Sequence, residues 1–305
     1  MTPFIPLADA PSQSEPGVDD PRLDHSDLGL RDVAASDVRH DNDDYEESHL
    51  DMLARMQERH FWYRGRHRFL LGALDRYLPR CGLDPTRASA LDVGGGCGGW
   101  LRDLRAARPG WFPRLALGDS APQALRYAAG VVGPDVELRQ IDLRRLPWRD
   151  EWDAVFLLDT LEHIKDDAAA LAELRAAVKP GGVAFVTTPA LESFRTWNDE
   201  LVHHHRRYSV ADYRRLAKET GWELVDARYF MFFLAPLALA SRFSRPALER
   251  MTEAERGRLL EKSHRVPFGP LNALLRGVFS LETPLGFWTR FPAGMSVLAV
   301  LRRPL

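Results

Sequence analysis

A glycine-rich loop is the first part of the sequence whose residue types point to chemistry. The stretch Leu91–Trp100 reads LDVGGGCGGW, in which an apolar run and an acid lead into a group of glycines. Glycine allows sharp turns and a close approach of a ligand, and a helix that starts after such a loop offers free N–H groups. We therefore predict that this loop holds a nucleotide-like cofactor, with a plain strand-to-helix turn as the simpler alternative.

The glycine spacing fits two kinds of cofactor. Gly94, Gly96 and Gly99 match the GxGxxG fingerprint of dinucleotide-binding loops. Gly94, Gly96 and Gly98 match the GxGxG loop of S-adenosylmethionine enzymes. The glycines alone leave both cofactors open.

Acidic residues that follow the predicted strands help to decide between the two cofactors. Asp92 lies just before the glycines, and Asp119 ends the next predicted strand, where a carboxylate can accept hydrogen bonds from both ribose hydroxyls of either cofactor. Asp142 follows the third strand and is placed to receive an exocyclic adenine amine. A KPGG turn at 179–182 precedes a later strand.

These residues must be positioned by alternating strands and helices. Apolar runs predict strands at 88–93, 114–117, 136–140, 152–158, 183–187, 222–229 and 295–301, and helical spacing predicts helices at 100–107, 121–129, 166–178 and 210–220. Such alternation indicates an α/β fold with a mostly parallel sheet and helices on both faces. Ligands of such sheets bind at the carboxyl ends of the strands, where the acids and the glycine loop fall.

The charge of the 305-residue chain is unevenly distributed. Residues 1–48 carry 13 acids and 3 bases, and the remaining 38 bases and 30 acids are spread along the body. We expect a disordered acidic tail, and we do not expect a nucleic-acid partner. Two cysteines without CxxC spacing, no signal peptide and no long apolar run indicate a cytoplasmic protein.

Taken together, the motifs resemble those of the class I S-adenosylmethionine-dependent methyltransferases. The matching segments are LDVGGGCG, LGDSAPQAL, IDLRRLPW, WDAVFLLDTLEHIKD and VKPGGVAFVTTP, within 88–228, and SVLAVLRR near the C-terminus. The resemblance implies a Rossmann-like sheet of seven strands with the last strand antiparallel. The expected parts are a tail (1–48), a helical cap (49–87), the donor-binding core (88–228), a hydrophobic helical insertion (229–293) and a final strand (294–305).

The resemblance also assigns cofactor residues. Gly94, Gly96 and Gly98 would pack against the methionine and ribose part of S-adenosylmethionine, and Asp92 would fix the loop or bond the methionine amine. Asp119 would hold the ribose, and Asp142 with the Leu143 backbone would hold the adenine. Asp159 would lie beside the reactive sulfonium.

The DTLEHI segment carries the candidate for acceptor chemistry. Methyl transfer to a hydroxyl needs an aligned nucleophile and a group that removes its proton. Asp159, Glu162 and His163 share one face if the segment is helical, and His163 could be the base. LEH resembles the subgroup that methylates ubiquinone precursors, in which a similar cluster is associated with a divalent metal. Asp159, Glu162 and His163 are therefore the candidate metal ligands, with helix bracing by Glu162 and pocket lining by His163 as the alternative.

A histidine-rich loop follows the fifth core strand. It reads VHHHRRYS, and in this fold it reaches over the acceptor site. His203, His205, Arg207 and Tyr208 are the candidate substrate-positioning residues. A structural brace by the arginine and tyrosine is the alternative.

Two further segments have competing interpretations. HFWYRGRHRFLL at 60–71 favours a helical cap over the cofactor pocket rather than a stacking surface for bases. The apolar stretches within 229–291, with arginines nearby, could contact the inner face of a membrane peripherally. Burial as a lid or as a dimer face is the alternative.

The prediction from the sequence is an S-adenosylmethionine-dependent methyltransferase that acts on a hydroxyl of a small-molecule, sugar or lipid-linked acceptor. An NAD(P)-dependent oxidoreductase would use Gly99 in place of Gly98 and would leave Asp142 and the LEHI segment without roles. A non-catalytic module that binds the donor or a membrane is the second alternative.

Overall fold

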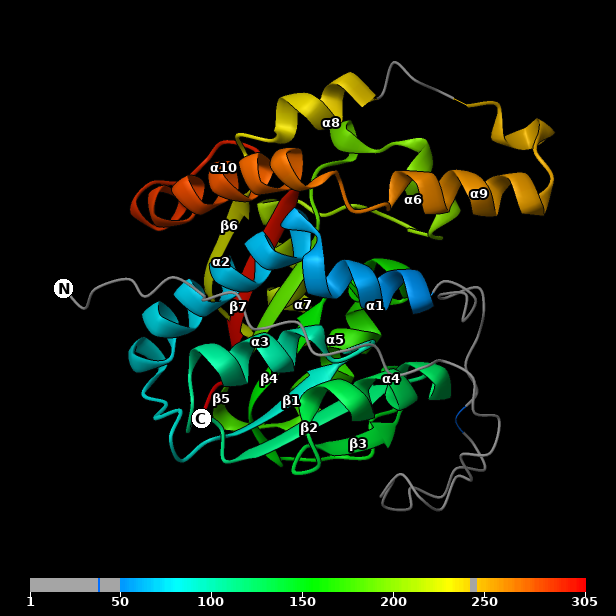
Figure 1. The fold of residues 1–305 in the computed structure, drawn as a ribbon. Coiled ribbons are helices and arrows are strands. Elements are labelled where there is room, and N and C mark those ends of the chain that lie inside the picture. Colours follow the sequence, from blue (N-terminus) through cyan, green and yellow to red (C-terminus); the bar gives the residue numbers. More distant parts are fainter. Residues whose placement is uncertain (1–37, 39–49, 242–245) are drawn as a thin grey trace, which may run out of the picture.

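The computed structural model describes residue 38, residues 50–241 and residues 246–305 (Figure 1). A seven-stranded sheet lies at the centre. Its strands are β1 (Ser89–Val93), β2 (Arg114–Asp119), β3 (Glu137–Gln140), β4 (Trp152–Leu158), β5 (Val178–Pro189), β6 (Glu223–Phe230) and β7 (Ser296–Arg302).

The sheet has the order β3-β2-β1-β4-β5-β7-β6. Strands β1 to β5 pair in parallel, whereas β7 lies antiparallel between β5 and β6. This confirms the predicted α/β sheet with an antiparallel last strand. The strand order reverses at β1, between β2 and β4, and a crevice for ligands is expected at the carboxyl ends there.

Helices cover both faces of the sheet and one end of the molecule (Figure 1). They are α1 (Leu50–Arg59), α2 (Phe61–Tyr77), α3 (Gly99–Ala107), α4 (Pro122–Val132), α5 (Asp167–Ala177), α6 (Trp197–Leu201), α7 (Val210–Thr220), α8 (Ala235–Ser241), α9 (Glu253–Ser263) and α10 (Gly269–Trp288). Helices α2, α3 and α4 pack on one face of the sheet, and α5 and α7 pack on the other.

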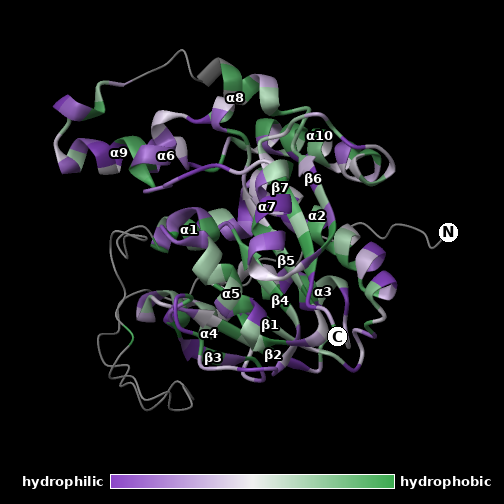
Figure 2. Cartoon of the chain, turned by 180° about the vertical axis from the view of Figure 1, so that it is seen from behind, coloured by the Kyte–Doolittle hydropathy of each residue, from purple (hydrophilic) through white to green (hydrophobic). Residues whose placement is uncertain are grey.

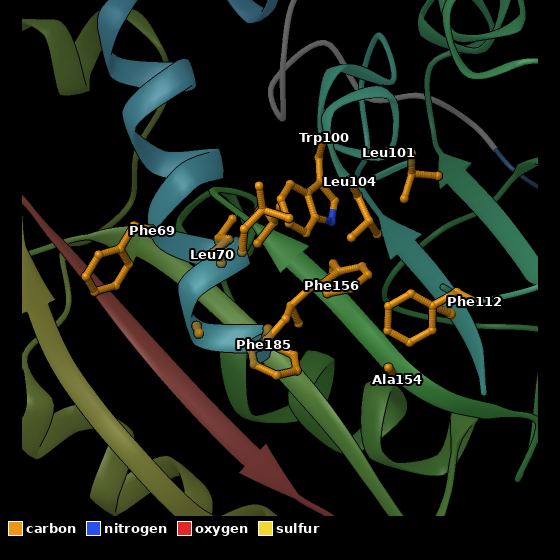
Figure 3. Close-up of a cluster of buried hydrophobic side chains, with 14 of the residues drawn as sticks. Phe69, Leu70, Trp100, Leu101, Leu104, Phe112, Ala154, Phe156 and Phe185 are labelled. Atoms are coloured by element: carbon orange, nitrogen blue, oxygen red, sulfur yellow. The ribbon is translucent and has the colours of Figure 1, made fainter. Parts of the chain in front are cut away.

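The apolar run of β4 shows why this sheet is buried on both faces. Phe156 packs between Trp100 of α3 and Phe185 of β5, with ring centroids 5.2 and 5.9 Å away (Figure 3). Its neighbours Val155 and Leu157 point to the opposite face, into the core under α5 and α7. Strands covered on both sides read as continuous apolar runs rather than as alternating patterns.

Boundaries differ from the sequence prediction mainly in β5. The strand begins at Val178, which pairs with Trp152 before a register shift, and regular pairing resumes between Ala154 and Val183. The sequence prediction placed the strand start after this irregularity because the KPGG turn reads as a loop.

The outer helices α8, α9 and α10 fall within the range 229–293 that was expected to be helical. Both ribbon views place them with α6 at one end of the molecule (Figures 1 and 2). No helix in the described part of the chain has both the length and the apolar character needed to cross a bilayer. The predicted acidic tail lies outside the described residues, apart from Val38.

Candidate active site

A cavity of about 500 Å³ lies between the carboxyl ends of β1 to β4 and the helices α1 and α2. Nine residues singled out from the sequence line it, namely Gly94, Gly96, Asp119, Asp142, Leu143, Asp159, Glu162, His163 and Arg207. The other five, Asp92, Gly98, His203, His205 and Tyr208, lie outside this lining.

The glycine loop has the backbone that only glycine adopts easily. Gly94, Gly96 and Gly98 have φ values of 68°, 56° and 82°, in the left-handed region. A Cβ on Gly94 would lie 2.5 Å from Thr160 Oγ1. Gly99 instead begins α3, and its N–H donates to Gln57 Oε1 at 3.1 Å. The structure therefore distinguishes the Gly94–Gly96–Gly98 triplet from Gly99.

Asp92 is a buried carboxyl group behind the loop. Its exposed fraction is 1%, and neither side-chain oxygen has a hydrogen-bond partner among the described residues. Burial, with a smaller contribution from the charge of Asp119, raises the pKa of Asp92 to about 8. A cationic group that reached this carboxylate would offset the cost of its ionisation.

Asp119 and Asp142 are held differently. The Asp119 carboxylate accepts hydrogen bonds from the Gly96 and Ala121 backbone N–H groups, both at 2.9 Å, which fix it at the end of β2. The Asp142 carboxylate is held by Arg144, through its backbone N–H at 2.8 Å and its Nε at 2.9 Å. Both carboxylates keep a place in the cavity wall.

Asp159, which follows β4, is paired with an arginine that the sequence analysis did not single out. Arg66 of α2 donates to one Asp159 oxygen, and Thr187 Oγ1 donates to the other at 3.0 Å. The Arg66 guanidinium carbon lies 4.9 Å from the ring centroids of both Trp62 and Tyr63. Of the interleaved aromatics and arginines of α2, Trp62, Tyr63 and Arg66 therefore face the cavity.

The predicted set of Asp159, Glu162 and His163 does not form one cluster. Residues Leu161–His163 make a single 3-10 turn rather than a longer helix. The candidate ligand atoms that lie within 4.8 Å of one another belong to Glu162, His163 and His204. The carboxylate of Asp159 is held instead by Arg66 and Thr187, so His204 takes its place in the candidate metal set.

Glu162 is the buried centre of this cluster. Its side chain is 0% exposed, and its carboxylate oxygens have no hydrogen-bond partner among the described residues. Burial, reinforced by the charge of Asp159, raises the pKa of Glu162 well above its usual range. The His204 Nε2 lies 3.9 Å from Glu162 Oε1, and the His163 and His204 rings meet edge to face at 4.9 Å.

His204 is oriented by a second carboxylate. Its Nδ1 lies 2.9 Å from Asp199 Oδ1. Burial opposes ionisation of Asp199, but the hydrogen bond with His204 and the charge of Arg207 outweigh it and hold its pKa well below the usual range. A carboxylate only accepts hydrogen bonds, so Nδ1 is the donor and the Nε2 of a neutral ring keeps its lone pair, on the Glu162 side.

The other residues of the histidine loop have different surroundings from those expected. His203 and His205 are exposed and do not line the cavity. Tyr208 is buried, and its hydroxyl donates to Asp167 Oδ2 at 3.0 Å, as the alternative of a structural brace implies. Arg207 lines the cavity and binds Asp199 with Nε and Nη2, at 2.8 and 3.1 Å.

Helix α1 lies over the glycine loop. Gln57 receives the Gly99 N–H, and Leu53 and Gln57 lie against Gly96, where a Cβ would come within 3.3 Å of both side chains. The sequence analysis missed Gln57, Arg66, Asp199 and His204. Signals existed for three of them: Arg66 and His204 lie in the arginine–aromatic and histidine-rich segments, and Thr196 and Asp199 have the spacing of a capping box, which α6 uses.

Comparisons with known proteins identify the family of this chain. The family described as "Methyltransferase domain" matches residues 61–227. A ubiquinone biosynthesis O-methyltransferase of Alkalilimnicola ehrlichii is 36% identical over 116 residues, which are 37% of this chain and 46% of the relative. A Mycolicibacterium smegmatis protein named a probable S-adenosylmethionine-dependent methyltransferase is 29% identical over 56% of this chain and 63% of its own length.

The chain thus spans about half to two thirds of these relatives. Among solved structures, a Haloferax volcanii complex between a methyltransferase activator and a methyltransferase contains a similar fold. Its TM-score is 0.52 at 19% identity, over 85% of this chain and 97% of that one. At this identity, the likeness concerns the fold alone.

Proposed function

Because this chain belongs to the class I S-adenosylmethionine-dependent methyltransferase family, we propose that it transfers the donor's methyl group to an oxygen atom of an acceptor bound in the same cavity. One observation carries the proposal. A single cavity is lined by Gly94, Gly96 and Asp119 and also by Glu162, His163 and His204. Donor and acceptor can therefore meet without leaving the protein.

The donor half uses the residues that line the strand ends. Asp119 accepts hydrogen bonds from the ribose hydroxyls, and Asp142 with Leu143 holds the adenine. The Asp92 carboxylate, which is buried behind the loop and outside the cavity lining, would receive the methionine amine through water, which gives this unpartnered buried group a partner. Asp159, held by Arg66 and Thr187, keeps a carboxylate close to the sulfonium.

The acceptor half needs a group that takes the hydroxyl proton. The His204 Nε2 suits this role because Asp199 fixes the proton on the other nitrogen. The carbon–sulfur bond to the methyl group breaks as the carbon–oxygen bond forms, and the hydroxyl proton passes to Nε2. His163, the base expected from the sequence, packs on the His204 ring and lines the same wall.

The same cluster fits a divalent cation. One carboxylate and two imidazoles are a common ligand set, and Asp199 behind His204 is the supporting partner that metal-bound histidines usually have. The unpartnered oxygens of buried Glu162 are also explained by such an ion. Glu162, His163 and His204 would hold it as an alternative to direct proton uptake by His204, whose Nε2 would then be a metal ligand, and the ion would lower the pKa of a bound hydroxyl.

The cavity walls favour an acceptor with an apolar portion. Met52, Leu53, Met56, Leu234 and Leu237 face the cavity from α1, α8 and the segment before α8. The name of the Alkalilimnicola relative, an O-methyltransferase of ubiquinone biosynthesis, agrees with such an acceptor. We therefore propose a hydroxyl on a small apolar or lipid-linked molecule, in preference to a free sugar.

Two measurements test this function. Calorimetry with S-adenosylmethionine and its demethylated product should give saturable binding, whereas NADH and NADPH should not bind. Transfer of a labelled methyl group to polyprenyl phenols should exceed transfer to free sugars. Absence of donor binding would refute the enzyme class, and transfer to nitrogen acceptors alone would refute the oxygen assignment.

A further inference from the structure

The outward face of α10 carries no polar side chain. Its large exposed residues are Leu271, Leu274, Leu281, Leu285 and Trp288, which we call the α10 face, with exposed fractions of 39, 63, 71, 42 and 92%. Every other exposed position of the helix is glycine, alanine or proline. A helix of 20 residues is about 30 Å long, so this apolar stripe is extensive.

Helix α10 differs from an ordinary surface helix because it is apolar on both sides, with Phe279 buried in the core on its inner side. Glu282 and Thr283 are buried on its inner side, and the Glu282 carboxylate accepts the Phe233 N–H at 2.9 Å. Surface helices normally turn their apolar side to the core and their charges to water. A large exposed apolar surface of this kind indicates an interaction site.

The apolar surface continues onto the segment around α8. Phe233, Leu237 and Leu239 are 44, 60 and 40% exposed. The ribbon of α8 is mostly green in Figure 2, next to α10 at the same end of the molecule. Phe233 and Phe291, which flank the two helices, pack edge to face at 5.7 Å.

Arginines border the C-terminal end of the α10 face. Arg76, Arg80, Arg228 and Arg290 line a cavity of about 350 Å³ that also includes Trp288. Asp226 neutralises part of this charge through Arg228 and Arg290.

Other arginines of this border have no acidic partner. Among the described residues, Arg76 and Arg80 make no ion pair with a carboxylate, and neither do Arg68 of α2 and Arg276 of α10. The border is therefore positively charged.

We propose that the α10 face and its arginine border bind the surface of an anionic lipid bilayer. Apolar side chains would enter the acyl boundary, and the arginines would meet lipid phosphates, as in other interfacial helices. The inner side of α10 packs closely on α2, where Phe279 occupies the space beside Gly65, so the helix lies flat against the body.

Vesicle sedimentation tests the proposal without any use of methyl transfer. The full chain should sediment with phosphatidylcholine vesicles that contain phosphatidylglycerol, and much less with phosphatidylcholine alone. The triple variant Leu274→Ser/Leu281→Ser/Trp288→Ser should bind at least about tenfold more weakly. Val131→Ser, a change at an exposed apolar residue of α4, should bind like the wild type.

A matched pair of double variants tests how much the arginines contribute to vesicle binding. Arg76→Gln/Arg80→Gln should weaken binding by about tenfold or more and reduce its salt dependence, because each arginine near the surface contributes measurably. Arg87→Gln/Arg126→Gln removes the same charge from exposed positions away from α10 and should leave binding unchanged.

Three results would overturn the proposal. The first is that the wild type stays in solution with both kinds of vesicle. The second is that the triple variant binds the vesicles as strongly as the wild type does. The third is a stable dimer in light scattering that the triple variant converts to monomer, which would assign the face to a second copy. All substituted positions are exposed or half-buried, so melting curves should confirm that the variants remain folded.

Discussion

Arg66 and Asp159 form an ion pair that joins helix α2 to the end of β4 across 93 positions of sequence. The guanidinium is 4% exposed, and it is flanked by the rings of Trp62 and Tyr63. Asp159 itself has a left-handed backbone, with φ of 54°. The pair therefore connects the helical cover of the cavity to the strand end nearest the proposed reaction.

Loss of Arg66 should destabilise the folded protein, and a second substitution should recover part of the lost stability. Arg66→Met leaves the Asp159 carboxylate without its charged partner and should lower the free energy of unfolding by about 3 kcal/mol. Arg66→Met/Asp159→Asn removes the unpaired charge and should recover part of that loss. Urea denaturation of the two single variants and the double variant measures the coupling, and additive effects would contradict it.

The neighbouring histidines 203 and 204 should differ in their effect on catalysis. His204→Ala removes the proposed proton acceptor and should lower kcat/KM by about 100-fold. His203→Ala changes an exposed residue of the same loop and should have little effect. Initial rates of methyl transfer decide the matter, and equal losses in both variants would remove His204 from the chemistry.

Donor binding should release a proton from Asp92. The pKa of Asp92 is about 8 in the free protein, so its carboxyl group is mostly protonated at pH 7. An ammonium ligand requires the ionised form, so affinity should rise by up to about tenfold per unit between pH 6 and 7. Calorimetry in buffers of different ionisation enthalpy measures the released proton, and Asp92→Asn should abolish both effects.

The Asp92 carboxyl group also predicts how the stability of the fold depends on pH. Its pKa is raised above the ordinary value of 3.8, so the folded state holds the proton more tightly than the unfolded state. The stabilisation from Asp92 is complete below about pH 4 and is lost as the pH rises through 8. Asp92→Asn should therefore flatten the decline in melting temperature between pH 5 and 8, and an unchanged slope would contradict the assignment.

A divalent cation should stabilise the protein through Glu162. Mn²⁺ or Zn²⁺ should raise the melting temperature of the wild type, because an ion bound to the folded state shifts unfolding by mass action. Glu162→Gln should remove this shift, while Glu200→Gln, at an exposed position of α6, should keep it. A chelator should lower methyl transfer, and added Mn²⁺ should restore it.

Two glycines of the α2–α10 pair should respond in opposite directions. A Cβ on Gly65 would lie 1.9 Å from Phe279 Cδ1, so Gly65→Ala should destabilise the fold by about 1–3 kcal/mol. A Cβ on Gly277 of α10 would meet nothing within 4 Å, so Gly277→Ala should stabilise the helix by about 0.5–1 kcal/mol. Thermal unfolding of both variants measures the contrast.

The sequence predicted the sheet, and it brought most of the proposed donor-binding residues to one cavity, because both depend on local patterns; Asp92 and Gly98 of that set lie outside the lining. A strand such as β4 is a continuous apolar run, and the glycines and acids follow strand ends at fixed spacing. Parallel strands bring those ends to one edge, so Gly94, Asp119 and Asp142 line one cavity without further information.

The acceptor side could not be predicted in the same way, because it depends on contacts between distant segments. Arg66 reaches Asp159 from a helix that precedes the sheet, and His204 meets Glu162 across a loop of irregular backbone. Periodicity placed Asp159, Glu162 and His163 on one face, but a single 3-10 turn does not maintain that face. Among three consecutive histidines, only the folded loop distinguishes the middle one.

Leu237 of α8 belongs to two surfaces at once, since it lines the cavity and is 60% exposed. If the protein is bound to the proposed lipid surface, an acceptor with a hydrocarbon tail would move from the lipid into the cavity past Leu237 without passing through water. The acceptor would then reach the cavity by diffusion within the lipid surface. The rate would follow the mole fraction of acceptor in the lipid surface rather than its concentration in solution, and dilution with inert lipid would slow turnover at constant total acceptor.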